Sequence, residues 1–239
     1  MKYILLSDGK SESGYGIYPS YLKRKIDIIL SIASLIILSP LLLIIAILVH
    51  FDIKSPIIYK QKRIGLNGKT FTIYKFNKMK DFHDKNGELL PDEQRITKFG
   101  MFLRSSSLDE LPQLWNILKG DMSIVGPRPL LEKDLAFMNP EQRKRHFVLP
   151  GLTGLAQING RNHLKWEDKF KYDLEYTQNI SFSGDIKICL KTIFLVIGQT
   201  NINYCNNRIE ENYDDYLLRN GKIDESVIRN KLTETRHSS

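Results

Sequence analysis

Two adjacent carboxylates, Asp109 and Glu110, are the residues of this 239-residue chain whose types and spacing best suit a chemical role. Neighbours on a helix are rotated by about 100°, so they do not share a face but can reach one small charged group from two sides. A carboxylate can attack phosphorus as a nucleophile, and a second one can hold Mg²⁺, which prefers oxygen ligands and substrate phosphates. The pair therefore indicates phosphate chemistry, with Mg²⁺ as the expected cofactor.

The alternative is that both acids only cap a helix. Ser107 and Glu110 match the S-x-x-E pattern of a capping box, and Asp109 as N-cap would leave Pro112 in the first turn, where proline is tolerated. For an isolated pattern of this kind, capping is the better interpretation. The chemical role is favoured here because basic residues accompany the acids and a helix N-terminus attracts phosphate.

Three basic residues could neutralise a phosphate at this place: Lys75, Arg104 and Arg128. Arg128 stands between Pro127 and Pro129, which fix the backbone on both sides of it. A guanidinium held in this way suits a two-pronged grip on phosphate oxygens. Taken alone, the same segment could equally be a surface arginine in a rigid turn.

An uncharged apolar run from residue 28 to residue 49 is the second informative feature. As a helix, its 22 residues would reach about 33 Å, enough to cross a hydrocarbon core of about 30 Å. Pro40 in the middle of the run invites a kink, and Ser39 beside it can satisfy a freed carbonyl.

Cations stand at both ends of this run: Lys23, Arg24 and Lys25 before it, and Lys54, Lys60, Lys62 and Arg63 after it. A helix that spans the bilayer cannot keep both groups on the cytoplasmic side. We therefore predict a re-entrant helix-break-helix over residues 21–52, which enters and leaves by the same leaflet. A kinked single span is the alternative.

The composition favours an anionic partner. The formal net charge is +8 and the pI is about 9.3, and the basic residues flank the apolar run, so lipid headgroups are preferred over nucleic acid. No nucleic-acid-reading motif is present, and no nucleic-acid partner is expected. Cys189 and Cys205 stand far apart without zinc-type spacing, which indicates neither a disulfide framework nor a zinc site and fits a reducing cytoplasm.

The remaining sequence predicts a mostly α fold with one small β-hairpin, formed by two partly alternating segments between residues 57 and 76. Helices are expected at 95–104, 109–119, 130–138, 166–178 and 184–198. The last is amphipathic, and it could lie in the membrane interface or pack on the core. The predicted units are an N-terminal arm (1–20), the membrane helix (21–52), a compact catalytic domain (53–200) and a C-terminal appendage dispensable for chemistry (201–239).

In its motifs the chain resembles the bacterial sugar transferase family, the monotopic polyprenyl-phosphate glycosyl-1-phosphate transferases, in their compact catalytic form. The resemblance rests on KRKIDIILS, the membrane run interrupted by Ser-Pro, YKQKRIGLNGKTFTIYKF, RITKFGMFLRSSSLDELPQLWNILKGDMSIVGPRPLL, LPGLTGLAQINGRN and WEDKFKYDLEY. It implies that Asp109 is the nucleophile, that Glu110 assists with Mg²⁺, and that Arg128 contacts the phosphate.

The resemblance assigns three further residues to the site: Lys75 of YKF, Arg104 of FLR and Asp173 of the segment between Trp166 and Tyr176. For Asp173 the alternative is a solvated helix face. One departure concerns the segment after Lys75, where the family has KFRxM and this chain has KFNKM. Either Lys78 replaces the missing arginine or that arginine is peripheral, and we favour the second interpretation.

The reaction that the resemblance implies is transfer of a sugar 1-phosphate from a UDP-sugar to polyprenyl phosphate, with release of UMP. The expected location is the bacterial inner membrane, with the catalytic domain facing the cytoplasm. A non-catalytic adaptor that binds anionic lipid or a partner protein is the competing hypothesis, which loss of the acidic pair or of Arg128 would have favoured. The sequence leaves open the sugar and the oligomeric state, including a homodimer.

Overall fold

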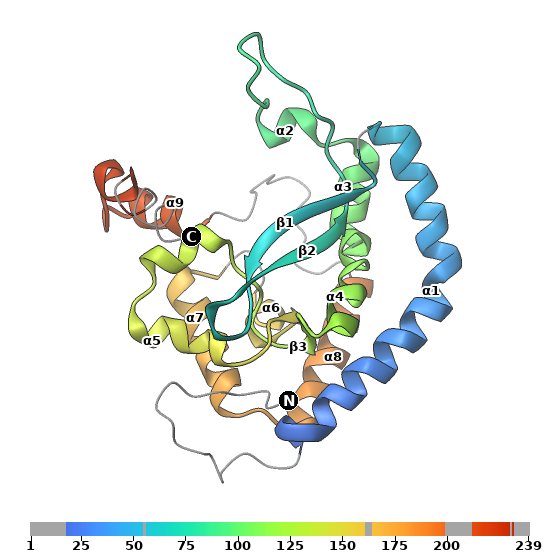
Figure 1. The fold of residues 1–239 in the computed structure, drawn as a ribbon, viewed down its shortest axis with the longest axis vertical. Helices are drawn as coiled ribbons and strands as arrows, with labels where there is room; N and C mark the ends of the chain where they lie inside the picture. Colours follow the sequence, from blue (N-terminus) through green and yellow to red (C-terminus); the bar gives the residue numbers. More distant parts are fainter. Residues whose placement is uncertain (1–17, 55, 161–163, 199–211, 230, 232–239) are drawn as a thin grey trace.

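The computed structural model describes residues 18–54, 56–160, 164–198, 212–229 and 231. Their fold is mostly helical with two small sheets, as Figure 1 shows. The α-helices are α1 (Lys23–Ile53), α2 (Asp92–Arg95), α3 (Lys98–Ser106), α4 (Gln113–Lys119), α5 (Pro140–Arg143), α6 (Leu155–Ile158), α7 (Trp166–Gln178), α8 (Phe182–Ile197) and α9 (Tyr213–Arg219). A π-helical turn covers Tyr18–Leu22, and 3₁₀ turns cover Leu66–Gly68, Leu108–Glu110, Glu132–Phe137 and Lys144–Phe147. The predicted N-terminal arm falls almost entirely outside the described residues.

The predicted β-hairpin is confirmed. Strands β1 (Ile58–Ile64) and β2 (Thr70–Phe76) pair antiparallel, and Tyr59 lies opposite Lys75. Ile73 and Phe76 of β2 are buried, in keeping with the side-chain alternation of a half-buried strand. The hairpin therefore carries Lys75 one residue before the end of β2, close to the residues that follow α3.

A second sheet, absent from our sequence prediction, fixes the segment before Arg128. Strands β3 (Ser123–Val125) and β4 (Gly151–Thr153) pair in parallel, with Val125 opposite Thr153. The pairing continues as Gly126 N donates to Thr153 O (2.9 Å) and Gly151 N donates to Pro127 O (2.9 Å). A Cβ at position 126 would lie 2.4 Å from Leu149 O, so only glycine allows this close approach.

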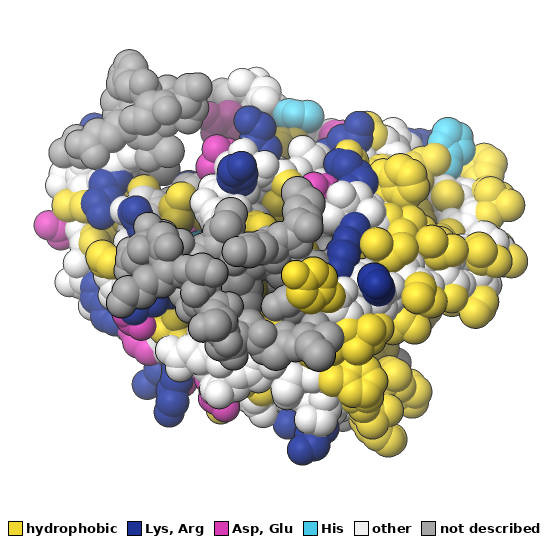
Figure 2. Space-filling model, turned by 60° about the horizontal axis from the view of Figure 1, so that its bottom comes forward, with side chains coloured by type: hydrophobic (Ala, Val, Ile, Leu, Met, Phe, Trp, Pro, Cys, Tyr) yellow, Lys and Arg dark blue, Asp and Glu magenta, His cyan; other side chains and the backbone are white. Residues whose placement is uncertain are grey.

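Helix α1 is the one described helix long and apolar enough to cross a membrane, and only 11% of its most apolar window is buried. Figure 1 shows it bowed along one edge of the molecule, and Figure 2 shows hydrophobic side chains gathered on that side. The helix continues through Pro40, where the predicted topology placed a break, and Ser39 Oγ donates to Ile36 O (2.8 Å). The helix is therefore bent and not broken at Pro40, since the loss of one backbone hydrogen bond bends a helix without ending it.

Polar contacts tie the first turns of α1 to the rest of the fold. The Arg24 guanidinium donates to the last carbonyls of α4 at Ile117 and Leu118, and buried Lys23 pairs with Asp185 of α8. Asp27 accepts from Ser123 Oγ (2.8 Å) and from the amide of Ile124 in β3 (3.1 Å). Two of the three cations expected to flank the membrane run are therefore used inside the domain, and only Lys25 is exposed.

The other end of α1 is also attached. Thr97 Oγ1 donates to Asp52 Oδ2 (2.5 Å), and Val49 and Ile53 pack in one hydrophobic cluster with Phe76 and Leu103. The same threonine caps α3 by accepting from Gly100 N. Both ends of the apolar helix are thus bound to a single folded unit.

Several predicted helix starts were wrong by a few residues. The helix expected at 95–104 begins at Lys98, because the Thr97 side chain supplies the N-cap and Ile96 pairs with Met79 in a β-bridge. The one expected at 109–119 begins at Gln113, after a 3₁₀ turn, and the one at 130–138 is a 3₁₀ turn over Glu132–Phe137.

The two C-terminal helices of the predicted catalytic domain are confirmed as α7 and α8. Ile188 of α8 is buried in a cluster with Val125, Ile158 and Tyr176. The opposite face carries exposed apolar side chains: Phe182, Ile186, Leu190, Ile193, Phe194 and Ile197. Helix α8 therefore packs on the core with one face and leaves an apolar face open.

The described part of the predicted C-terminal appendage is packed against the domain. Tyr213, Tyr216 and Leu217 of α9 are buried in a cluster that includes Trp166 and Phe170 of α7. The division that we placed near residue 200 therefore does not separate two hydrophobic cores.

Candidate active site

Asp109 and Glu110 lie in the 3₁₀ turn between α3 and α4. Ser107 before them adopts the left-handed region (φ 58°) and ends α3, so the chain turns sharply before the acids. The Ser107 side chain makes no capping hydrogen bond, and helix α4 begins only at Gln113. The capping-box interpretation was therefore wrong, because a residue that caps a helix with its side chain has extended φ and ψ angles, whereas Ser107 lies in the left-handed region.

Glu110 receives two cations on one carboxylate oxygen. Lys75 Nζ lies 2.6 Å and Arg128 Nη2 lies 3.1 Å from Glu110 Oε1. Burial alone would raise the pKa of Glu110, but the charges of Lys75 and Arg128 outweigh it and hold that pKa far below its usual range. Burial lowers the pKa of Lys75, and the Glu110 carboxylate opposes this change. Three residues from separate parts of the sequence thus converge on one point.

Asp109 is only 3% exposed and pairs with Lys78, whose Nζ lies 2.7 Å from Asp109 Oδ2. Asn77 Oδ1 accepts from the amides of Lys78 (2.8 Å) and Met79 (3.2 Å) and so forms the turn that follows β2. The side chain that departs from the family pattern therefore shapes a turn, and its neighbour contacts the expected nucleophile. This contact favours the interpretation that Lys78 replaces the family arginine, and the peripheral position that we preferred stays a prediction.

Asp173 is linked to Arg128 through a residue that sequence reasoning missed. Arg145, 2% exposed, pairs with Asp173 Oδ2 (2.7 Å from Nη2) and donates from Nη2 to the backbone oxygen of Arg128 (2.7 Å). Asp173 itself is 4% exposed, which rules out the solvated helix face that we had kept as its alternative. Burial raises the pKa of Asp173, and Arg145 opposes that shift. Asp173 therefore supports the arginine loop and does not contact the acidic pair.

Arg104 stands in the last turn of α3, five residues before Asp109, and is half-buried. Its guanidinium makes no hydrogen bond or ion pair with any residue that the structure describes.

The cluster that we call the site cluster consists of Lys75, Lys78, Asp109, Glu110 and Arg128. Its three cations outnumber its two carboxylates, which suits an anionic ligand. Within the described residues no group of three or more His, Cys, Asp or Glu could hold a metal ion. The two carboxylates still fit Mg²⁺, because this ion usually binds one or two carboxylates and takes further oxygens from phosphate and water.

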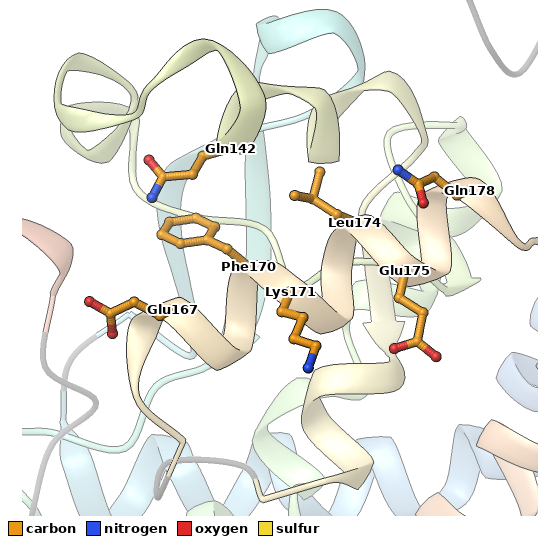
Figure 3. Close-up of a pocket in the computed structure, with 7 residues that line it drawn as sticks. All are labelled: Gln142, Glu167, Phe170, Lys171, Leu174, Glu175 and Gln178. Carbon is orange, nitrogen blue, oxygen red and sulfur yellow. The ribbon is translucent and has the colours of Figure 1, made fainter.

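An open pocket elsewhere on the surface does not belong to this cluster. It lies between α5 and α7, with Phe170 and Leu174 between the charged side chains of Glu167, Lys171 and Glu175, as Figure 3 shows. None of the six predicted site residues lines it.

Comparison with known proteins agrees with the motifs. The sequence model of the family described as bacterial sugar transferase matches residues 18–199. An uncharacterized sugar transferase, EpsL of Bacillus subtilis, is 47% identical over 192 residues, which cover 80% of this chain and 95% of the relative. The exopolysaccharide production protein ExoY of Sinorhizobium fredii is 40% identical, with coverage of 72% and 83%.

A longer relative carries a named reaction. The UDP-glucose:undecaprenyl-phosphate glucose-1-phosphate transferase of Klebsiella pneumoniae is 44% identical over 187 residues, which cover 72% of this chain but only 39% of the relative. The described site, the matched region and these identities lead to one conclusion: the chain belongs to the bacterial sugar transferase family.

Proposed function

We propose that this protein transfers a sugar 1-phosphate from a UDP-sugar to polyprenyl phosphate, with undecaprenyl phosphate as the expected acceptor. The observation that carries the proposal is the site cluster, in which a buried carboxylate stands beside a second carboxylate and three cations. Relatives named as a UDP-glucose:undecaprenyl-phosphate glucose-1-phosphate transferase and an undecaprenyl-phosphate galactose phosphotransferase support the substrate classes.

In the first step a carboxylate oxygen of Asp109 attacks the phosphorus attached to the sugar. The bond from that phosphorus to the bridging oxygen breaks, and UMP leaves with the electron pair. The aspartate then carries the sugar phosphate as an acyl phosphate. In the second step a phosphate oxygen of the lipid attacks the same phosphorus, which restores the Asp109 carboxylate and forms a diphosphate-linked lipid.

The other residues of the site orient the substrate and neutralise the charge of its diphosphate. Arg128 and Lys75 offer donors to the diphosphate oxygens, and Glu110 holds both cations in place until substrate arrives. Lys78 must leave Asp109 before attack, and its charge then faces the transferred phosphate. Bound Mg²⁺, held by Glu110 and Asp109, would supply further positive charge for the diphosphate.

We also propose that α1 is re-entrant and that the catalytic domain faces the cytoplasm at the inner membrane. Its 31 residues extend about 46 Å, longer than a hydrocarbon core of about 30 Å. Yet Asp27 near one end contacts β3, and Asp52 near the other end contacts α3. If the helix crossed the bilayer, one folded unit would have to bind it on both sides of the membrane, so entry and exit on one side is the better arrangement.

The exposed apolar face of α8 supports the same arrangement. Its buried start is joined to α1 by the Lys23–Asp185 pair, so the two apolar surfaces belong to one rigid unit. An amphipathic helix with such a face suits the boundary between headgroups and acyl chains. This placement would bring the site cluster to the depth of the lipid phosphate.

The test of the reaction is release of UMP from a panel of UDP-sugars, with and without undecaprenyl phosphate in detergent micelles. We expect one UDP-sugar to give sustained UMP release that needs the lipid and stops on removal of Mg²⁺ with a chelator. Binding of anionic lipid without any UMP release would favour the adaptor hypothesis.

The topology has its own test. With Cys189 and Cys205 replaced by serine, cysteines at exposed positions Lys25 and Lys60 should both be shielded from an impermeant reagent in intact cells and react after lysis. Labelling of Lys25→Cys from outside would show a single-span anchor. Replacing Pro40 should straighten the helix. The N-terminal end of α1 should then lie outside in some molecules and inside in others, because its basic residues favour the cytoplasmic side of the membrane.

A further inference from the structure

We propose that the C-terminal segment containing α9 positions Arg128 for the transfer reaction. The inference rests on the proposed function and concerns a part of the chain outside residues 18–199, the region that matches the family. We call residues 212–229 the C-terminal clamp.

The clamp fills a hydrophobic cluster between two parts of the domain. Tyr213, Tyr216 and Leu217 are at most 7% exposed. On one side they pack with Leu130, Phe137 and Met138, which follow Arg128 in the sequence; on the other side they pack with Trp166 and Phe170 of α7. The Tyr213 ring lies 5.0 Å from the Trp166 ring and 5.1 Å from the Phe170 ring, between centroids.

Polar contacts repeat this bridging pattern. Asp214 Oδ2 lies 2.6 Å from Lys133 Nζ, in the 3₁₀ turn after Arg128. The Tyr216 hydroxyl donates to Glu167 Oε2 of α7 (2.6 Å), and Lys222 pairs with the same carboxylate. Each side of the bridge is therefore held by an ion pair or hydrogen bond as well as by apolar packing.

The bridging matters because these two parts support Arg128. Downstream, Leu130 O accepts from Ile64 N (2.9 Å), which fastens the chain two residues after the arginine to the end of β1. From α7, Asp173 holds Arg145, and Arg145 donates to the backbone oxygen of Arg128. The clamp contacts the first turns of α7 and the residues after Leu130, so it fixes the distance between the two supports.

The Arg128 side chain depends on this backbone. It is 34% exposed and its Nη2 lies 3.1 Å from Glu110 Oε1, so solvent can compete for this ion pair. A displacement of about 1 Å in a group that orients substrate can cost much of its effect. The clamp therefore acts on substrate binding through Arg128 and leaves Asp109 untouched.

The clamp offers matched pairs of variants on one helix. Leu217 is 7% exposed whereas Leu218 is 37% exposed, and Asp214 is buried whereas Asp215 is exposed. Leu217→Ala and Asp214→Asn should loosen the clamp, and Leu218→Ala and Asp215→Asn are their controls. The nearly isosteric Asp214→Asn keeps the test open if Leu217→Ala does not fold.

Two measurements in the full-length protein test the proposal. The first is hydrogen exchange in a peptide covering residues 126–131, which we expect to speed up in both clamp variants while exchange in α4 at residues 113–119 stays unchanged. The second is steady-state kinetics, in which we expect KM for the UDP-sugar to rise about three- to tenfold while kcat changes by less than about twofold. The control variants should match the wild type in both.

The proposal is overturned if folded Leu217→Ala and Asp214→Asn show wild-type exchange at 126–131 and a wild-type KM. It is also overturned if activity falls only in proportion to the folded fraction, with KM unchanged, since that is the result of a purely stabilising contact. Absence of UMP release from the wild type would reject the proposed function instead, and the exchange measurement would still test the clamp.

Discussion

Two clusters of charged and polar residues differ in how their charges are satisfied. The first is the site cluster. The second, which we call the anchor cluster, ties α1 to α8 and β3. It consists of Tyr18, Lys23, Asp27, Ser123, Tyr176 and Asp185.

The anchor cluster has two carboxylates and one cation, and hydroxyl groups donate the further hydrogen bonds that the carboxylates accept. Asp185 accepts from Lys23 and from the hydroxyls of Tyr18 and Tyr176 (2.9 Å for Tyr176), and Asp27 accepts from Ser123. Lys23, Asp27 and Asp185 are all at most 6% exposed. Every charge has a partner inside the protein, which is the pattern of a structural contact.

The site cluster has the opposite balance. Three cations share two carboxylates, two of those cations meet on one oxygen, and both Lys78 and Arg128 remain accessible to solvent. A surplus of accessible positive charge prepares a site for an anion, whereas the anchor cluster has no charge left to offer. Changes at the first should alter chemistry, and changes at the second should alter stability.

The largest expected effect is that of Asp109→Asn. The amide is nearly isosteric but a poor nucleophile, so UMP release should fall by about a thousandfold or more while the protein stays folded and membrane-bound. The measurement is initial-rate UMP release, with thermal unfolding and membrane fractionation as controls. Activity near the wild-type level would contradict the covalent mechanism.

Glu110→Gln should also reduce UMP release severely and should weaken the dependence of UMP release on Mg²⁺.

The second largest effect is expected for Arg128→Lys. The substitution keeps the charge but loses the planar pair of donors, so kcat/KM should fall by about ten- to a hundredfold. Arg128→Gln, which removes the charge as well, is the comparison variant. If Arg128→Lys is fully active while Arg128→Gln is not, the arginine supplies charge alone and its grip on the phosphate is not two-pronged.

Asp185→Asn tests the anchor cluster. Removing the Asp185 charge breaks the buried Lys23–Asp185 ion pair, which should cost about 3 kcal/mol of stability. Activity per folded molecule should remain, because the cluster contacts no residue of the site. Thermal unfolding in detergent measures the loss, and Lys23→Met added to Asp185→Asn should recover part of it. If Asp185→Asn kept wild-type stability but lost activity, the anchor cluster would have a role in the reaction and not in stability.

The sequence predicted those features that have a local signal. The hairpin and α7 follow from side-chain periodicity, and the acidic pair stands out by its residue types. Parallel strands β3 and β4 were missed because three residues are too few to show a period. The starts of α3 and α4 were misplaced because Thr97 and Pro112 decide them through geometry that the apolar pattern does not carry.

The missed parts of the site are all contacts between distant segments. Lys78 and Asp109 are 31 residues apart, and Arg145 and Asp173 are 28 apart. Neither pair has a spacing that marks it in the sequence. Arg145 stands among other basic residues, Lys144 and Arg143, and nothing in that run shows which one is buried. Such pairs emerge only when the fold brings β2 to α3 and the 144–147 turn to α7.

The smallest effect that we predict is that of Lys78, and it tests the idea of surplus charge directly. Lys78→Met leaves two cations against two carboxylates in the site cluster, so the attraction for an anionic substrate should weaken. We expect KM for the UDP-sugar to rise about threefold at low ionic strength with little change in kcat, and Lys78→Arg to behave like the wild type.

Salt separates this electrostatic role from a structural one. Lys78 is 23% exposed, so added salt should screen its charge and reduce the difference in KM between Lys78→Met and the wild type. A difference that persists undiminished at high salt would mean that Lys78 acts by holding the Asp109 side chain in place. An unchanged KM at low salt would show that the surplus cation does not prepare the site, and the contrast between the two clusters would then lie in solvent access alone.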